Sequence, residues 1–296
     1  MSYIAIAVVA YMLYAINGVV DKFLLTKAVK SPAVYAFYIG ITSPMTWVLA
    51  PFGLKFVGPL DLLIAIIGGA SFVVALYFLY VATRQTTISR LLPIEGGLVP
   101  IFTLVFAYLF LGERLSQTQL LAFGLMVLGA VLIAFKYEKG GWYAKALGNA
   151  TIAAVFFALS FVLTKYIFDE TNFVSGLIWT RLGFFLVSVS MLIPKTTRQK
   201  IFNAPKETSK GNIFLYYGAR VSGGLAGLLQ NYAISLGSVT LVNAMQGTQY
   251  AFLLVMAILL SRYYPRVLKE QISFAIFLQK IAAIILISGG LYFLAR

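Results

Sequence analysis

Apolar stretches follow one another along almost the whole chain, and short stretches with charges, proline or glycine separate them. Each apolar stretch has about the length, roughly 20 residues, that a helix needs to cross the hydrocarbon core of a bilayer. The charged, proline and glycine positions set the boundaries. The pattern predicts an all-α integral membrane protein of ten transmembrane helices, at residues 4–24, 33–54, 62–83, 88–111, 118–135, 147–168, 173–193, 213–236, 239–260 and 274–294.

The ten predicted helices divide into five and five. A basic, glycine-containing stretch at residues 136–145 is the best candidate for the boundary. We therefore predict a first five-helix repeat at residues 1–137, a linker at 138–145 and a second five-helix repeat at 146–296. Because five is an odd number, the second repeat enters the bilayer from the opposite side, which makes the two halves inverted repeats.

The two halves also match at individual positions, which tests a repeat better than hydropathy does. Residues 15–23 of the first predicted helix align with residues 158–166 of the sixth, and both runs end in a lysine beside an aromatic residue. Further matches follow in the same order in both halves: Tyr80 with Tyr232, Gln119 with Gln279, and Gly129 with Gly289. The shared order favours an internal repeat.

The most distinctive run of the chain is Leu111-Gly112-Glu113-Arg114-Leu115-Ser116, with Pro100 before it and Gln119 and Gly129 after it. Together with residues 77–110, this run resembles the EamA domain of the drug/metabolite transporter superfamily, and the likeness covers nearly the whole chain. The resemblance implies a ten-span carrier that works by alternating access on a small-molecule substrate. It leaves the substrate open, because that superfamily handles amino acids, sugars, nucleotide-linked compounds, drugs and lipid precursors.

Two positions depart from the pattern that the resemblance implies. The second half has Lys269-Glu270-Gln271 in place of a second Gly-Glu-Arg, and the second predicted helix has Tyr38 in place of the usual arginine. The corresponding residue of the seventh predicted helix, Arg181, is an arginine.

The composition narrows the possible functions. Hydrophobic residues make up 61% of the chain and charged residues 11%, which excludes a water-soluble fold. The sequence has no cysteine and no histidine, so thiol, disulfide, Cys/His zinc and imidazole chemistry are excluded. It also has no phosphate-binding loop and no His-Glu-x-x-His motif. We therefore expect no enzyme activity, no metal and no cofactor.

Two ionisable residues at membrane depth are the strongest candidates for substrate or ion binding, because a charge in hydrocarbon needs a partner or a use. Arg181 lies near the middle of the seventh predicted helix and offers a planar fork for a carboxylate or phosphate. Glu95 lies among Pro93, Gly96 and Gly97, which are expected to loosen the fourth helix. It could bind a proton or a cationic group of the substrate. The alternatives are a structural pin at Arg181 and a plain ion pair at Glu95.

Several polar residues share helix faces with spacings that are typical of a cavity wall. In the eighth predicted helix, Arg220, Gly224, Gly227 and Asn231 form one such stripe, although Gly223 and Gly227 also suit tight helix packing. We predict that the following residues line a substrate or ion site with Arg181 and Glu95: Arg220, Asn17, Tyr77, Tyr80, Asn231, Asn243 and Gln246. Each tyrosine or amide could instead be an interhelical hydrogen-bonding group.

Two lysines occupy matched positions near helix ends. Lys22 and Lys165 could act as gates on opposite sides of the carrier, or could simply extend to the membrane interface.

The net charge of +14 comes from basic residues in short loops between helices, which argues against a nucleic-acid partner and for contact with the lipid bilayer. Most of these residues lie in the loops after odd-numbered helices, and only Lys55, Arg114 and Arg296 lie on the opposite side. Because basic loops stay in the cytoplasm, this bias predicts both termini outside, in the plasma (inner) membrane. The resemblance implies the reverse orientation. No signal peptide is expected, since no basic region precedes the first apolar stretch.

The sequence therefore predicts a secondary active transporter of a small polar metabolite that carries a carboxylate or phosphate, such as an amino acid. Whether a proton is transported together with the metabolite is left open. A lipid or lipid-precursor flippase and a passive channel are the alternatives. The oligomeric state is left open.

Overall fold

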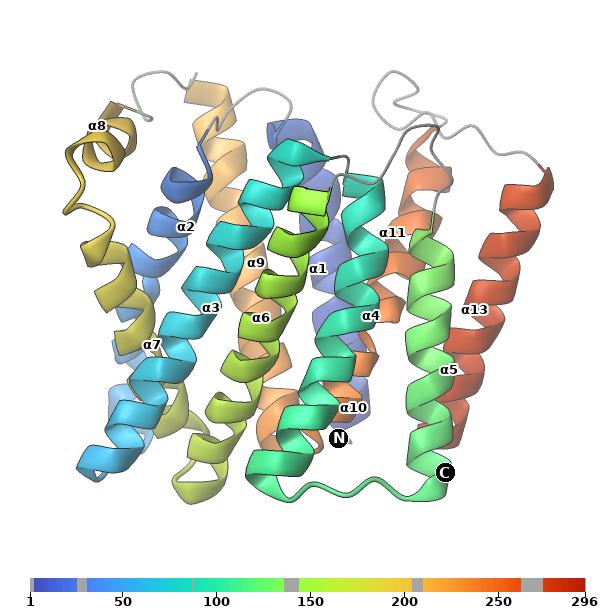
Figure 1. Ribbon diagram of the computed structural model, residues 1–296, viewed down its shortest axis with the longest axis horizontal. Helices are drawn as coiled ribbons and strands as arrows, with labels where there is room; N and C mark the ends of the chain where they lie inside the picture. The colour runs from blue at the N-terminus through green and yellow to red at the C-terminus, as the bar shows by residue number, and fades with distance from the viewer. Residues whose placement is uncertain are drawn as a thin grey trace. The chain divides into compact units, whose positions relative to one another are not determined.

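The computed structural model describes residues 3–25, 31–86, 88–135, 144–203, 210–261 and 274–295. In this part of the chain every regular element is a helix (Figure 1). The elements are α1 (Tyr3–Leu25), α2 (Pro32–Ile41), the 3₁₀ helix η1 (Ser43–Phe52), α3 (Pro59–Gln85), α4 (Ile88–Phe106), the π turn η2 (Ala107–Leu111), α5 (Gln117–Ala134), α6 (Ala144–Glu170), α7 (Phe173–Ser190), α8 (Lys195–Asn203), α9 (Lys210–Leu236), α10 (Val239–Ala244), α11 (Gln246–Ser261) and α13 (Phe274–Ala295).

Seven helical segments among the described residues are long and apolar enough to cross a membrane. They are Pro32–Phe52, Pro59–Gln85, Ile94–Leu111, Gln117–Ala134, Ala144–Glu170, Phe173–Ser190 and Ile276–Ala295, with a shorter apolar helix at Tyr3–Asn17. The segments predicted at 213–236 and 239–260 are helical as α9 and as α10 followed by α11. The membrane-protein prediction is confirmed, and the full count of ten spans stays a prediction.

Three predicted helices differ in detail from their expected form. The second is interrupted at Thr42, where α2 gives way to η1, because Pro44 lacks the N–H that would continue α2 and suits the first turn of a new helix. The ninth is interrupted at Met245, between α10 and α11. The fourth was expected to loosen around Glu95, but α4 runs through Pro93, Gly96 and Gly97 without interruption, and the irregular turn is η2.

The distinctive Leu-Gly-Glu-Arg-Leu-Ser run has a clear local structure. Gly112 ends η2 with φ of 66°, in the left-handed region that favours glycine. Ser116 then begins α5 with a capping box, in which its hydroxyl accepts from the backbone N–H of Gln119 and the Gln119 side chain accepts from the Ser116 N–H. This run is therefore a helix stop followed by a helix start.

The described chain forms two compact units, and each combines segments from both predicted repeats. The first unit comprises residues 1–28, 114–137 and 209–296, and holds α1, α5, α9, α10, α11 and α13. The second comprises residues 29–113 and 138–208, and holds α2, η1, α3, α4, η2, α6, α7 and α8.

Each unit contains a group of three helices, of which one comes from one predicted repeat and two come from the other. In the first unit, α1 packs against α9 and α11. In the second unit, α6 packs against α3 and α4 and lies between them (Figure 1). One helix of one predicted half therefore packs in both cases against the third and fourth helices of the other half.

The last helices of the two predicted halves, α5 and α13, pack against each other in the first unit through reciprocal glycine contacts. Gly129 of α5 lies against Ala283 and Ile287 of α13, and Gly290 of α13 lies against Ala122 and Met126 of α5. One constant shift in residue number relates Ala122, Met126 and Gly129 of α5 to Ala283, Ile287 and Gly290 of α13. Each helix therefore uses equivalent positions in the contact, as expected for an antiparallel pair of equivalent helices. The position of α13 that is equivalent to Gly129 in this contact is Gly290, one residue beyond Gly289, which the sequence alignment selects.

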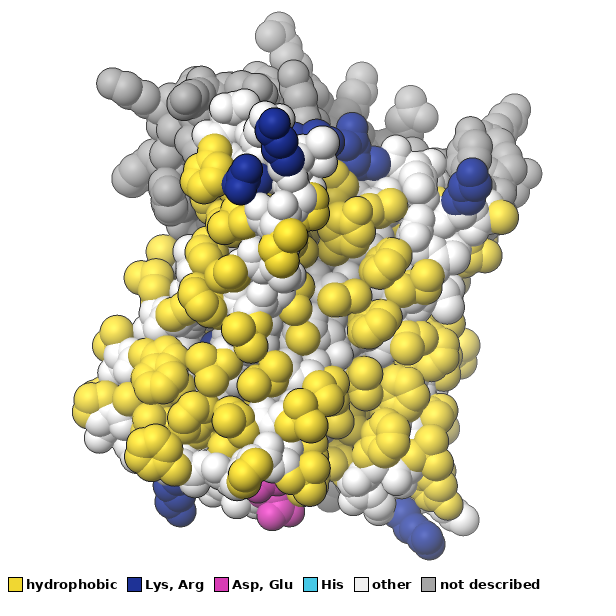
Figure 2. Space-filling view, turned by 60° about the vertical axis from the view of Figure 1, so that its left-hand side comes forward, with side chains coloured by type: hydrophobic (Ala, Val, Ile, Leu, Met, Phe, Trp, Pro, Cys, Tyr) yellow, Lys and Arg dark blue, Asp and Glu magenta, His cyan; other side chains and the backbone are white. Residues whose placement is uncertain are grey.

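In the second unit, glycines bring helix backbones together. A Cβ at Gly69 of α3 would meet the backbone of Thr180 in α7, and a Cβ at Gly183 of α7 would meet the backbone of Ile66 and Ala70 in α3. Such close approach is typical of helix packing in membranes, where the hydrophobic effect does not drive helices together and small residues let the backbones pack closely. Figure 2 shows an outer face of the protein. Hydrophobic side chains cover most of this face, and most of the lysine and arginine side chains in view lie at its top and bottom.

Candidate functional site

Arg181 lies in the middle of α7 in the second unit and is half-buried. Its guanidinium carbon lies 4.1 Å from the centre of the Phe184 ring, one turn further along the helix. Its backbone carbonyl accepts a hydrogen bond from the Ser43 hydroxyl of η1, at 3.0 Å. The arginine is therefore held at membrane depth against an aromatic ring.

The start of α7 is tied to the loop between η1 and α3. The Trp179 indole N–H donates to the Lys55 carbonyl at 2.8 Å, and the Lys55 backbone N–H donates to the Ser175 hydroxyl at 2.8 Å. The Asn172 side chain caps α7 at the Ser175 N–H and also donates to the Gly53 carbonyl. These bonds fix the half of α7 that leads to Arg181.

Glu95 lies in α4 of the second unit and is half-buried. Within the described part of the chain its carboxylate makes no ion pair, so the alternative of an ion pair with Arg181 finds no support. The side chain of Arg90, the nearest arginine along α4, lies outside the described side chains. Glu95 is thus a carboxylate in a predicted span without a described counter-charge.

The two tyrosines of α3 differ in their surroundings. The Tyr80 ring packs edge-on against the Tyr35 ring of α2, with centres 4.5 Å apart. Tyr77 is 37% exposed and its ring contacts Phe78 of the same helix. Tyr38, at the position where the resemblance implies an arginine, donates to the Ile201 carbonyl of α8 at 3.3 Å. Here it fastens α8 to α2.

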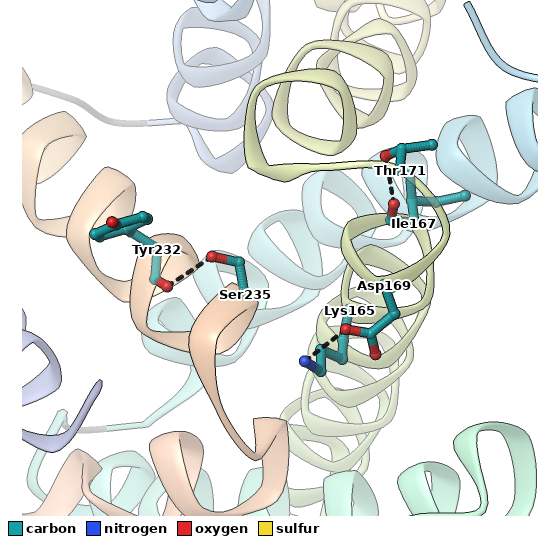
Figure 3. Close-up of polar contacts among 6 residues, drawn as sticks. All are labelled: Lys165, Ile167, Asp169, Thr171, Tyr232 and Ser235. Carbon is teal, nitrogen blue, oxygen red and sulfur yellow. Dashed lines mark hydrogen bonds and ion pairs between the residues drawn. The ribbon is translucent and has the colours of Figure 1, made fainter. Parts of the chain in front are cut away.

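Lys165 forms a local ion pair near the end of α6. Its ammonium lies 2.7 Å from a carboxylate oxygen of Asp169, one turn further on (Figure 3). The lysine side chain is 14% exposed and the aspartate side chain 51%. Thr171 closes the same helix end by donating to the Ile167 carbonyl, as Figure 3 also shows.

A hydrogen-bond network of neutral side chains lies in the first unit, and two of its members, Gln230 and Tyr11, were not among the predicted site residues. Gln230 of α9 accepts from the Tyr14 hydroxyl at 3.1 Å, and donates to the Tyr11 hydroxyl and to the Asn243 side-chain oxygen, both at 3.3 Å. Tyr11 in turn donates to the Val242 carbonyl of α10 at 2.8 Å. Tyr11, Gln230 and Asn243 are all at most 6% exposed, so this is a core network.

The face of α9 that meets α1 differs from the predicted stripe by one position. A Cβ at Gly223 would lie 3.0 Å from the Asn17 side-chain nitrogen, and one at Gly227 would lie 3.1 Å from the Tyr14 hydroxyl. Gly224, by contrast, has nothing within 4 Å of its added Cβ. The residues that face α1 are Gly223, Gly227 and Gln230, which supports the tight-packing interpretation of Gly223 and Gly227, whereas Gly224 lies outside this contact.

The other predicted site residues of the first unit make local bonds. Asn231 donates to the Gly227 carbonyl of its own helix at 2.8 Å, and Asn243 donates to the Val239 carbonyl at 3.0 Å. Gln246 donates to the Tyr250 hydroxyl at 3.1 Å. On the same α9, the Ser235 hydroxyl donates to the Tyr232 carbonyl (Figure 3). The side chains of Arg220 and Lys22 lie outside the described residues.

The predicted site residues thus divide between the units. The second unit holds Arg181, Glu95, Tyr77, Tyr80 and Lys165, and the first holds Asn17, Asn231, Asn243, Gln246, Lys22 and Arg220. Among the described residues, no group of three or more acidic, histidine or cysteine side chains is placed to hold a metal. Among the described charges within candidate membrane spans, Arg181 and Glu95 belong to the second unit, and Lys280 of α13 belongs to the first.

Comparison with known proteins gives a family and a fold. Residues 1–135 match the EamA-like transporter family. No curated protein sequence matches the chain. Among solved structures, one crystal structure of a protein with 16% sequence identity matches with a TM-score of 0.68, over 98% of this chain and 97% of that one. At this identity the likeness shows the fold alone, and it shows it over the full length of the chain.

Proposed function

Since the chain carries an EamA-like transporter domain in residues 1–135 and so belongs to the drug/metabolite transporters, we propose that it is a secondary active transporter of a small carboxylate- or phosphate-bearing metabolite. It works by alternating access across the membrane. An amino acid satisfies the same chemistry, because its carboxylate suits an arginine and its ammonium suits a carboxylate.

The observation that carries this proposal is the half-buried Arg181 at the centre of α7, in a segment long and apolar enough to span a membrane. A guanidinium at that depth costs at least about 2.5 to 3.5 kcal/mol even on the lenient insertion scale. A charge at such a cost points to a use, and the guanidinium can bind a planar anion through parallel N–H donors.

Glu95 supplies the opposite charge in the same unit. A carboxylate at membrane depth without a described counter-charge is suited to bind a proton or the ammonium group of a substrate. We assign it the coupling role: it takes up a proton in one half of the transport cycle and releases it in the other.

The ten-span inverted repeat provides the framework for this mechanism. The reciprocal glycine contacts of α5 and α13, and the two matching three-helix groups, support equivalence of the two halves. Within the first unit, the start of α1 and the end of α13 lie at the same end (Figure 1), which supports an even number of spans. The loop charges favour termini outside the cytoplasm, and a C-terminal reporter that is active only in the cytoplasm tests this orientation.

The proposal is tested by thermal-shift screening of the purified protein with three classes of metabolite: amino acids, di- and tricarboxylates, and sugar or nucleoside phosphates. We expect stabilisation by one anionic class. Arg181→Ala should lower the affinity for that ligand about 10- to 100-fold, in line with the loss of a charged hydrogen bond. Glu95→Gln should remove the pH dependence of its uptake into proteoliposomes.

Two exposed residues provide matched controls, Arg198→Ala on α8 and Glu170→Gln at the end of α6. These substitutions remove the same charges outside the proposed site and should leave binding unchanged. A ligand that stabilises the wild type, Arg181→Ala and Glu95→Gln equally would show that the site assignment is wrong. Flux that does not saturate with concentration would show a channel instead of a carrier.

A further inference from the structure

The Arg181 guanidinium lies on an aromatic ring that is itself held in a ring cluster. Arg181 and Phe184 are three positions apart on α7, so their side chains share one face of the helix. The distance of 4.1 Å from the guanidinium carbon to the ring centre is within the range of a cation–π interaction.

Other rings fix the position of the Phe184 ring. Phe184 is 4% exposed and lies almost parallel to Phe72 of α3, with centres 4.8 Å apart and planes 23° apart. Phe72 also contacts Phe157 and Phe161 of α6, edge-on, at 5.2 Å and 6.2 Å. Three helices therefore contribute to the surface beneath the arginine.

An aromatic ring stabilises a cation in a way that suits a binding site. The negative face of the ring attracts the guanidinium, and the attraction grows when water is excluded. A ring contacts the guanidinium through its face, and this contact takes none of the five N–H donors, which lie in the guanidinium plane. The ring compensates part of the burial cost of the charge and does not compete with an anionic ligand.

We infer that Phe184, fixed by Phe72, is a positioning residue that holds the Arg181 guanidinium by one face and presents its N–H edge to the anionic group of the substrate. This inference rests on the proposed role of Arg181 in substrate binding. It adds a specificity element that neither residue type nor spacing indicated: the strength of anion binding depends on the electron density of a phenylalanine ring.

The test replaces Phe184 with phenylalanines of increasing fluorination, which keep the shape of the ring and weaken its negative face. Radiolabelled L-glutamate, succinate and inorganic phosphate serve as uptake probes in proteoliposomes. For the probe that is transported, KM should rise stepwise with fluorination, to about tenfold for the most fluorinated ring, while kcat and Tm stay unchanged. Phe184→Leu should raise KM to a similar extent and lower Tm as well.

Phe157 provides the matched control, because its ring belongs to the same cluster and contacts Phe72, while Phe184 carries the arginine. Fluorination at Phe157 should leave KM unchanged. An unchanged KM across the Phe184 series, in a protein whose uptake is lost in Arg181→Ala, would overturn the positioning role and leave the proposed function intact. Saturable uptake that Arg181→Ala does not weaken, or no saturable uptake of any probe, would overturn the proposed function and the inference with it.

Discussion

The helix group of α1, α9 and α11 in the first unit and the group of α6, α3 and α4 in the second unit share an arrangement and differ in chemistry. In the first group, α1 and α9 are joined by neutral polar side chains centred on Gln230, which bond to one another. In the second group, α3 and α6 are joined by phenylalanine rings centred on Phe72. The second unit also carries charges of both signs in candidate membrane spans, Arg181 and Glu95, whereas the described span α13 of the first unit carries Lys280.

Matched positions of the repeat make this difference concrete. The alignment of residues 15–23 with residues 158–166 pairs Asn17 with Ser160, and its extension by one position pairs Tyr14 with Phe157. Tyr14 bonds to the side chain of Gln230, whereas Phe157 contacts the ring of Phe72. The same helix crossing can therefore be built from hydrogen bonds or from rings, and in this chain the first unit uses its amides and hydroxyls for packing. This comparison predicts that anion binding depends on the second unit.

Two helix crossings, α3 with α7 in the second unit and α1 with α9 in the first, differ in how closely their backbones approach. In the second unit, a Cβ at Gly69 or Gly183 would meet backbone atoms of the facing helix. In the first unit, a Cβ at Gly223 or Gly227 would meet only the ends of side chains, at 3.0 Å and 3.1 Å. Backbone atoms cannot move aside, and side-chain ends can.

The largest effect is expected from Gly183→Ala and Gly69→Ala. Each should lower the free energy of unfolding by about 2 to 3 kcal/mol, because the new methyl group forces α3 and α7 apart. Thermal unfolding of the purified protein measures the change. Gly148→Ala in α6, where nothing lies within 4 Å, is the control and should be neutral or slightly stabilising. Equal stability of Gly148→Ala and Gly183→Ala would contradict the close crossing.

Gln230→Leu should have the next largest effect, about 1 to 2 kcal/mol of destabilisation, since Tyr11, Tyr14 and Asn243 lose a hydrogen-bonding partner. Substrate affinity should change less than about twofold, measured by thermal-shift titration. Gln199→Leu, at an exposed position of α8, is the control. If Gln230→Leu lowered affinity as much as Arg181→Ala, the first unit would belong to the binding site after all.

Gly227→Ala should change stability by less than about 1 kcal/mol, because the helical preference of alanine offsets a small displacement of the Tyr14 hydroxyl. Its comparison with Gly183→Ala, in the same unfolding assay, tests whether the α1–α9 and α3–α7 crossings differ in backbone approach. A loss as large as that of Gly183→Ala would remove the difference.

The smallest effect is expected at the Lys165–Asp169 pair. Asp169→Asn should alter stability by about 0.5 kcal/mol or less, because a local pair with a half-exposed partner is weak. Uptake should also stay within about twofold of the wild type if the pair only closes the end of α6. A severe loss of uptake at unchanged stability would instead support the predicted gating role of Lys165.

The sequence predicted the membrane-protein class and the transporter family, and it located the charges that distinguish the second unit. It selected Asn231 on α9 but missed Gln230, one position earlier. The available signal was Gly223, Gly227 and Gln230 at intervals of four and three, which is as good a helical stripe as the one chosen. Periodicity alone could not separate the two stripes.

The sequence by itself determined the local properties of each segment. An apolar stretch of membrane length, a charge within it, or a glycine that ends a helix at Gly112 depends on local residues and on the bilayer. The tertiary structure decided which helix faces meet. Tyr11 and Gln230 are 219 positions apart, and Phe72 reaches Phe184 from another helix, so these contacts depend on how whole helices pack. The sequence alone thus identifies the charged residues, whereas the packing of the helices determines what surrounds them.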